Sequence, residues 1–149
     1  VIYENPSALP RVMFVAMTQG ADFAAMLTSG QWPSGFDPRR TVLLDGAARG
    51  TIYLSGMGAL PKEPDRVRIV SYRNTEVVVE ATSARGGWVV LNDLWHPWWF
   101  AEVDGQPVPV LKANVMFRAV EVPKGTHTLR FVFRPLPGAW AQLNTPKTP

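Results

Sequence analysis

Residues 91–105 read LNDLWHPWWFAEVDG, and they hold three of the chain's six tryptophans and one of its two histidines. Alternating apolar runs, typical of β-strands, flank this stretch on both sides. Successive side chains on a strand point to opposite faces, so one strand cannot hide so many aromatic rings on a single face. We therefore expect part of the cluster formed by Trp95, Trp98, Trp99 and Phe100 to meet a second sheet, a partner or a ligand.

Around this stretch the sequence reads as a series of short strands separated by turns that are rich in Gly, Pro and Asn. Strands are predicted over residues 11–17, 41–45, 51–54, 67–72, 76–81, 88–91, 100–103, 108–111, 115–122 and 127–134. The dipeptide Asp104-Gly105 predicts a tight hairpin between residues 100–103 and 108–111. This spacing of strands and turns indicates a mainly β protein, an antiparallel β-sandwich of jelly-roll type.

A short helix is predicted in the N-terminal part, over residues 20–30. Asp22 can cap its start, and Gly30 can end it in the left-handed conformation. Phe23, Met26 and Leu27 fall on one face of this helix and are its candidate core side. The sandwich with its helix is expected to form a single domain over residues 1–135. Residues 136–149 are expected to form a Pro-rich tail or linker, and residues 46–65 a mobile loop.

Composition and charge exclude several classes of protein. The 149 residues suffice for one domain with a core, and the absence of cysteine excludes disulfides and cysteine-based metal sites. The net charge of +3 is small and the arginines are scattered, so nucleic acid is not an expected partner. The sequence has no run of about 18 apolar residues and does not begin with Met. We therefore expect a fragment of a larger protein.

Several short motifs, in order, resemble the C-terminal soluble region of bacterial YfhO-type membrane proteins. They are residues 3–6 (YENP), 9–11 (LPR), 36–40 (FDPRR), 71–75 (SYRNT), 91–93 (LND) with Pro97 and Trp99, 103–105 (VDG), 113–114 (AN), 117–120 (FRAV) and 122–127 (VPKGTH). The similarity runs from Tyr3 to about Pro135. One departure is the WHPWW sequence of residues 95–99, where the pattern would have an aromatic pair, Pro, Gly and Trp.

The resemblance implies a place and a role for the chain. Members of this family are multi-spanning proteins of the bacterial inner membrane and are similar to glycosyltransferases that use lipid-linked sugars. This region would be their extracytoplasmic, periplasmic domain, close to the membrane surface, with its own transmembrane part as a partner. The catalytic acid would lie in that transmembrane part. The resemblance therefore implies an accessory domain without catalytic residues, which positions or covers the membrane-embedded site or holds a glycan acceptor.

The aromatic stretch also supplies candidate ligand-binding residues: Asn92, Asp93, Trp95, His96, Trp98 and Trp99. Flat aromatic rings can stack on a sugar ring, and the polar members can bind its hydroxyl groups. This composition makes a stand-alone carbohydrate-binding module the alternative function. The competing interpretation is that Trp95 and Trp99 pack between the sheets, while Trp98 meets the membrane interface or the membrane domain.

Enzymatic interpretations are less well supported by the residues. Asp93 could orient His96 as a general base, but no Ser in a nucleophile elbow accompanies them, so a structural role is favoured. Glu102 and Asp104 could form the acid pair of a glycoside hydrolase, although Asp104 is better explained as the first residue of the hairpin turn. The two distant histidines give no metal-ligand spacing, and no cofactor is expected.

Overall fold

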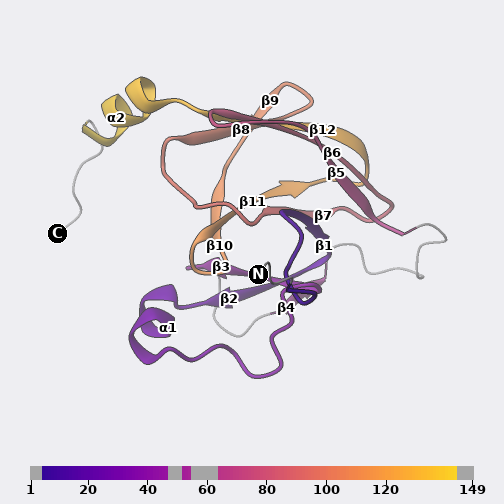
Figure 1. The fold of residues 1–149 in the computed structure, drawn as a ribbon, viewed down its shortest axis with the longest axis vertical. Helices are drawn as coiled ribbons and strands as arrows, with labels where there is room; N and C mark the ends of the chain where they lie inside the picture. Colours follow the sequence, from indigo (N-terminus) through magenta and orange to yellow (C-terminus); the bar gives the residue numbers. More distant parts are fainter. Residues whose placement is uncertain (1–4, 47–51, 55–63, 144–149) are drawn as a thin grey trace, which may run out of the picture.

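A computed structural model describes residues 5–46, 52–54 and 64–143 of the chain as two packed β-sheets (Figure 1). The larger sheet has the order β1 (Val12–Val15), β7 (Gly87–Leu91), β11 (Phe117–Val122), β10 (Leu111–Ala113), β3 (Thr41–Asp45), β2 (Met17–Ala21) and β4 (Ile52–Leu54). The smaller sheet has the order β5 (Arg66–Arg73), β6 (Glu76–Ser83), β12 (Gly125–Phe133), β8 (Trp99–Val103) and β9 (Gln106–Val108). Most of the predicted mobile loop, residues 46–65, lies outside the described residues.

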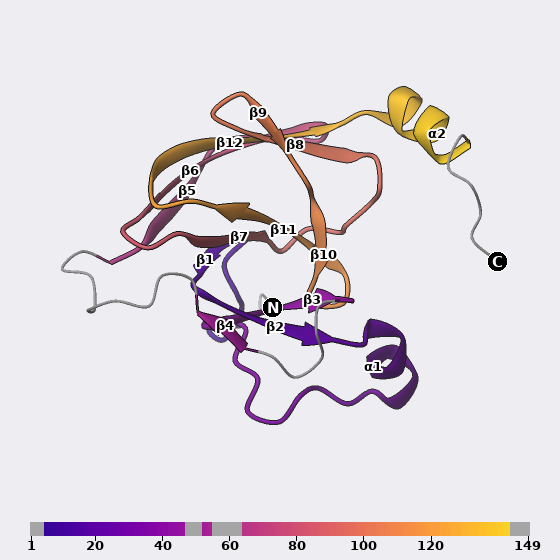
Figure 2. The same ribbon diagram turned by 180° about the vertical axis from the view of Figure 1, so that it is seen from behind.

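The path of the chain confirms the predicted sandwich. The chain passes from one sheet to the other between β4 and β5, β6 and β7, β7 and β8, β9 and β10, and β11 and β12. Strands β2 and β3 pair in parallel, whereas the other strand pairs of the described residues are antiparallel. Figures 1 and 2 show the smaller sheet lying over β1, β7 and β11, with β2, β3 and β4 forming a further layer beneath them.

The main core lies between the two sheets and is built from alternating residues of their facing strands. Its buried members are Val77, Val79, Ala81, Val89, Leu91, Ala101, Val103, Val120, Val122, Leu129 and Phe131. A second cluster, which includes Val42, Trp88 and Val90, packs on the opposite face of β7. Strand β7 is therefore buried on both faces, which explains why its sequence is continuously apolar rather than alternating.

The predicted N-terminal helix is present as α1 (Phe23–Ser29). The Asp22 side chain accepts a hydrogen bond from the Ala25 N–H at 3.0 Å, and Gly30 ends the helix with φ 69°. Phe23 is buried against Leu43 and Val115, but Leu27, which was predicted on the same apolar face, is exposed. The helix therefore packs on the sheet through Phe23 and the partly buried Met26.

Three predicted strands run across points where the chain turns or changes sheet. The run 11–17 is divided at Ala16 into β1 and β2, which occupy different positions in the larger sheet. The return strand of the Asp104-Gly105 hairpin is β9, whereas Leu111 belongs to β10 in the other sheet. Residues 115–116 precede β11 because Asn114 and Val115 both have positive φ, and Asn114 exchanges hydrogen bonds with the backbone of Leu43.

The predicted tail begins with a helix, α2 (Pro135–Leu143), which projects from the end of the smaller sheet (Figure 1). Pro135 and Pro137 both lie in the first turn of this helix. The N–H groups of a first helical turn have no partner within the helix, so proline is tolerated there.

Candidate functional site

The loop 92–98, which joins β7 to β8, is held in place by an arginine from the inner face of β11. Arg118 donates from Nη1 to the Leu94 carbonyl at 3.0 Å and from Nη2 to Asp93 Oδ2 at 3.2 Å. The residue is only 2% exposed. Burial lowers the pKa of Arg118, while the nearby Asp93 and Tyr72 oppose this shift. The guanidinium remains charged at neutral pH, so the loop is built around a buried ion pair.

Asp93 joins three segments that are distant in the sequence. Its Oδ1 accepts from Arg11 Nη1 at 2.8 Å, and its Oδ2 accepts from the Tyr72 hydroxyl at 3.0 Å as well as from Arg118. Arg11 also donates to the Tyr72 hydroxyl at 2.8 Å and stacks on the Tyr72 ring. The carboxylate therefore connects the start of β1, the end of β5 and β11 at one end of the sandwich.

Aromatic rings form the side of the site next to this network. The Arg118 guanidinium lies 3.8 Å from the centre of the Trp99 ring, and the Phe133 ring lies 5.3 Å from it on β12. Such stacking leaves the planar edge of the guanidinium available for its hydrogen bonds to the loop. Trp99 thus contacts both a cation and a second aromatic ring.

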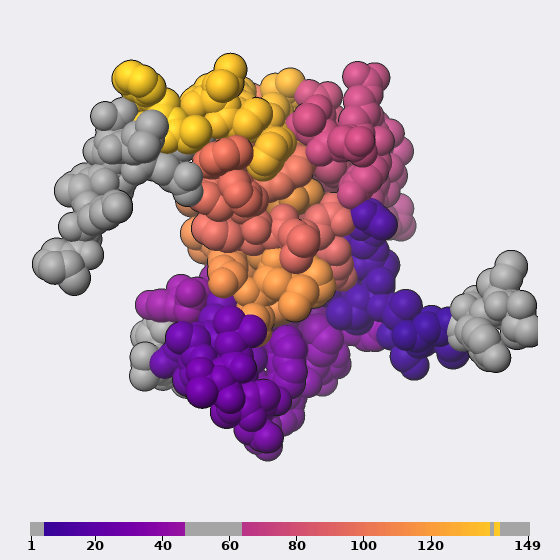
Figure 3. Space-filling model, turned by 60° about the vertical axis from the view of Figure 1, so that its left-hand side comes forward, coloured from indigo at the N-terminus to yellow at the C-terminus, as the bar shows by residue number. Residues whose placement is uncertain are grey.

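Together these groups line an open pocket of about 370 Å³. Asp93, Trp99 and Arg118 form its less exposed part, and the exposed side chains of Tyr72, Arg73 and Asn74, from the end of β5 and the turn that follows it, lie at the rim. Figure 3 shows the coral and orange part of the chain, around residues 90–120, in the centre of one face, with α2 above it and α1 below it. The pocket thus offers both aromatic surface and hydrogen-bonding groups.

The six sequence-predicted residues divide into three pairs around this pocket. Asp93 and Trp99 line it. His96 and Trp98 instead pack edge to face with each other, with ring centres 4.7 Å apart, and both rings contact Phe133. His96 Nδ1 accepts a hydrogen bond from the Trp98 N–H at 3.2 Å, while the carboxylate of Asp93 is bound by Arg11, Tyr72 and Arg118.

The turn that contains Trp98 does not require glycine. The Trp99 N–H donates to the His96 carbonyl at 3.0 Å, which closes a β-turn with Pro97 and Trp98 at its centre. Trp98 is not among the positive-φ residues of the described chain. A tryptophan can therefore occupy this position, and its ring extends the aromatic surface beside Phe133.

Asn92 and Trp95 anchor the loop and lie outside the lining of the pocket. The Asn92 side chain donates to the Pro10 carbonyl at 2.6 Å. The Trp95 indole donates to the Val110 carbonyl at 3.3 Å, and its backbone N–H donates to Met116 at 2.7 Å. Trp95 is half-buried, which agrees with the interpretation that it packs within the fold.

Sequence reasoning did not include Arg11, Tyr72 and Arg118 in the site. Arg118 did have a detectable signal, because it shares the inward face of β11 with Val120 and Val122, and a charged residue on an apolar face usually has a buried partner. Arg11 and Tyr72 carried no comparable signal, since their meeting with Asp93 depends on how the two sheets pack.

The other candidate acids are engaged elsewhere. Glu102 lies 3.7 Å from Arg130 and 3.6 Å from Arg134, and Asp104 Oδ2 lies 2.6 Å from His127 Nδ1. Asp104 and Gly105 both have positive φ, which confirms the predicted hairpin turn. Within the described ranges, no group of three or more His, Asp or Glu residues is arranged to hold a metal ion. No described helix is long and apolar enough to cross a membrane.

Comparison of the chain with protein-family models, with curated proteins and with solved structures gave no match.

Proposed function

We propose that this chain is a non-catalytic accessory domain on the extracytoplasmic side of a bacterial multi-spanning membrane protein, where it holds a saccharide. The observation that carries the proposal is the pocket at Asp93, in which the rings of Tyr72 and Trp99 lie beside charged and amide side chains. Aromatic faces match the apolar faces of sugar rings, and planar polar groups bind hydroxyl groups. The membrane setting rests on the resemblance to YfhO-type proteins.

The polar network supports binding rather than acid–base chemistry. The Asp93 carboxylate accepts hydrogen bonds from Arg11, Tyr72 and Arg118, so it is oriented and has limited capacity left for a further donor. Such a group can accept one hydroxyl of a ligand. Arg73 and Asn74 at the rim add donors that a sugar can use. The proposed role is to position a glycan for a reaction that takes place elsewhere in the parent protein.

A stand-alone carbohydrate-binding module is the second candidate, and the same pocket favours it. The two candidates share the ligand and differ in what the domain is attached to. A transmembrane sequence encoded in the same gene supports the accessory domain, and its absence from the gene supports the stand-alone module.

The proposal is tested by screening the 149-residue chain against an array of bacterial surface glycans. Arg73→Gln and Asn74→Ala change the rim of the pocket and leave the buried network intact, so each should weaken binding of any glycan that the chain retains. Trp32→Ala removes an exposed aromatic ring beside α1 and is the control that should bind like the unchanged chain. Retention of no glycan, or equal binding by all of these variants, would contradict the proposal.

A further inference from the structure

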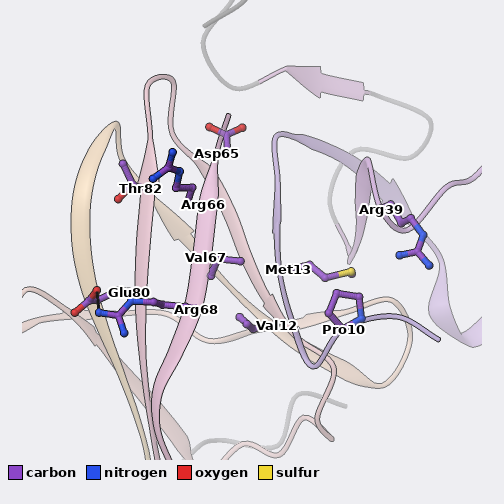
Figure 4. Close-up of a pocket in the computed structure, with 10 residues that line it drawn as sticks. All are labelled: Pro10, Val12, Met13, Arg39, Asp65, Arg66, Val67, Arg68, Glu80 and Thr82. Carbon is purple, nitrogen blue, oxygen red and sulfur yellow. Dashed lines mark hydrogen bonds and ion pairs between the residues drawn. The ribbon is translucent and has the colours of Figure 1, made fainter. Parts of the chain in front are cut away.

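A second and larger cavity, of about 780 Å³, lies along the same strand as the pocket. It is a groove between β5, at the edge of the smaller sheet, and the N-terminal segment that enters β1 in the larger sheet (Figure 4). Val12, Met13 and Val67 give it an apolar wall. Arg39, Arg66 and Arg68 from two separate segments of the chain line it as well.

The charges around this groove do not cancel. Arg68 pairs with Glu80 at 2.6 Å, and Asp65 pairs with Arg85 at 3.7 Å. These two pairs account for both carboxylates that line the groove. Arg39 and Arg66 are exposed, and neither has a carboxylate partner among the described residues.

Arg39 is nevertheless held in position. Its Nη2 donates to the Ser7 carbonyl at 3.2 Å, and its backbone N–H bonds to the Asp37 side chain at 2.9 Å. Two arginines beside an apolar wall suit a ligand that combines an apolar face with an anionic group, because guanidinium binds carboxylate and phosphate through paired hydrogen bonds.

The groove and the pocket are connected through β5 and Arg11. Arg66 and Arg68 line the groove at one end of β5, and Tyr72 and Arg73 line the pocket at the other end. Arg11 lies between the groove and the pocket. Its neighbours Pro10 and Val12 line the groove, while its own side chain donates to the hydroxyl of Tyr72 in the pocket. Arg66 in the groove and Tyr72 in the pocket are six residues apart on β5, which corresponds to roughly 20 Å along a strand. A ligand that reaches from one site to the other must therefore be an oligomer.

We infer that the groove is a second subsite, which binds the anionic part of an extended acidic oligosaccharide whose other end occupies the pocket at Asp93. This inference rests on the proposed saccharide-binding function. The pocket supplies aromatic contact to one sugar unit, and Arg39 and Arg66 bind a carboxylate or phosphate several units away. A strand added to the free edge of β5 is the less suitable occupant, because charged side chains and the bulge between Ile69 and Ser71 disfavour strand pairing there.

The test measures affinity for acidic and neutral members of one glycan series at several chain lengths, with the carboxylates methyl-esterified in the neutral members. Longer acidic members should bind more tightly than short or esterified ones, and added salt should weaken their binding. Arg66→Gln and Arg39→Gln should each lower the affinity for long acidic members by about threefold to fivefold and leave short members unaffected. Arg40→Gln, which alters an exposed arginine outside the groove lining, is the matched control.

The outcomes separate this inference from the function on which it rests. If long and short members bind equally and Arg66→Gln has no effect, the second subsite is wrong and the pocket stands. If no glycan of either charge binds, both are wrong. Arg66-dependent binding to vesicles of anionic lipid, without binding to acidic glycans, would assign the groove to lipid phosphates and overturn the inference.

Discussion

The guanidinium of Arg118 lies 3.8 Å from the centre of the Trp99 ring and is almost completely buried. The same group binds Asp93 and the Leu94 carbonyl, so one side chain of the larger sheet fixes both the aromatic wall and the polar centre of the pocket. Its Nε is buried without a hydrogen-bond partner, which is consistent with a position against the Trp99 ring. The site thus depends on Arg118 even though a ligand need not touch it.

Replacement of Arg118 by Met should destabilise the fold and loosen the loop 92–98. Met fills part of the volume but leaves Asp93 partly buried with one ion-pair partner fewer, and removal of one partner of a buried pair costs about 3 kcal/mol or more. Urea unfolding followed by tryptophan fluorescence measures the loss. Arg118→Lys keeps the charge without the forked geometry, so its stability should lie between that of the unchanged chain and that of Arg118→Met. A loss below about 1 kcal/mol for Arg118→Met would show that the ion pair is not a structural centre.

Replacement of Arg11 by Ala should have a much smaller effect on stability, although Arg11 binds the same carboxylate at a shorter distance. Its side chain is 55% exposed, so water competes for the interaction and the expected loss is less than about 1 kcal/mol. The same urea titration checks this expectation. Equal losses for Arg11→Ala and Arg118→Met would mean that burial does not control the strength of these two ion pairs.

The Asp104–His127 pair should make stability depend on pH. The hydrogen bond to Asp104 raises the pKa of His127, with a contribution from the Lys124 carbonyl, and the same bond to His127 lowers the pKa of Asp104. The contribution of His127 is complete below about pH 6.5 and is lost as the pH rises through its raised pKa. The contribution of Asp104 is complete above about pH 4 and is lost as the pH falls through its lowered pKa.

The matched variant for this pair is Asp104→Asn, because Asn-Gly suits the same hairpin turn and keeps an acceptor for the Thr128 N–H. The unchanged chain should be more stable than Asp104→Asn at pH 5.5, and the difference should shrink towards pH 9. The midpoints of urea unfolding of both proteins, measured at a series of pH values, give this difference in stability. A difference that stays constant over this range would show that the charge on His127 contributes nothing.

Gly87 should not tolerate a side chain. A Cβ at this position would lie 2.8 Å from both the Phe14 ring and the Val15 carbonyl, where β1 pairs closely with β7. Gly87→Ala should therefore push β1 away and lower the free energy of unfolding by about 1–3 kcal/mol. Gly30→Ala is the comparison, since its Cβ meets no atom within 4 Å and only its left-handed backbone is strained. A larger loss for Gly30→Ala would contradict this account of the β1–β7 contact.

The sequence pattern was sufficient for the sandwich but less informative about where the chain changes sheets. Val77, Val79 and Ala81 alternate in the sequence and form the inner face of β6, and Asp104-Gly105 located the hairpin. The bend at Ala16 and the turn at Asn114 have no local signal of comparable strength. Both depend on tertiary contacts, such as the bonds between Asn114 and Leu43, which single-sequence patterns do not contain.

The candidate site was also predictable only in part, because tertiary contacts bring some of its residues together. Asp93 and Trp99 lie in the aromatic stretch, which the sequence made conspicuous. Arg11 and Tyr72 come from 82 and 21 residues away from Asp93, and only the packing of the two sheets brings them together. Arg118 is the intermediate case, since its place on an apolar face is a sign of a buried partner but does not identify that partner.

The most direct test of saccharide binding at this pocket is an NMR titration that follows the six tryptophan indole N–H signals as the best-binding glycan of the array is added. The account predicts that the Trp99 signal shifts and saturates with the same affinity as binding, while the Trp32 signal beside α1 stays in place. Saturable binding with an unmoved Trp99 signal, or a larger shift at Trp32, would contradict it.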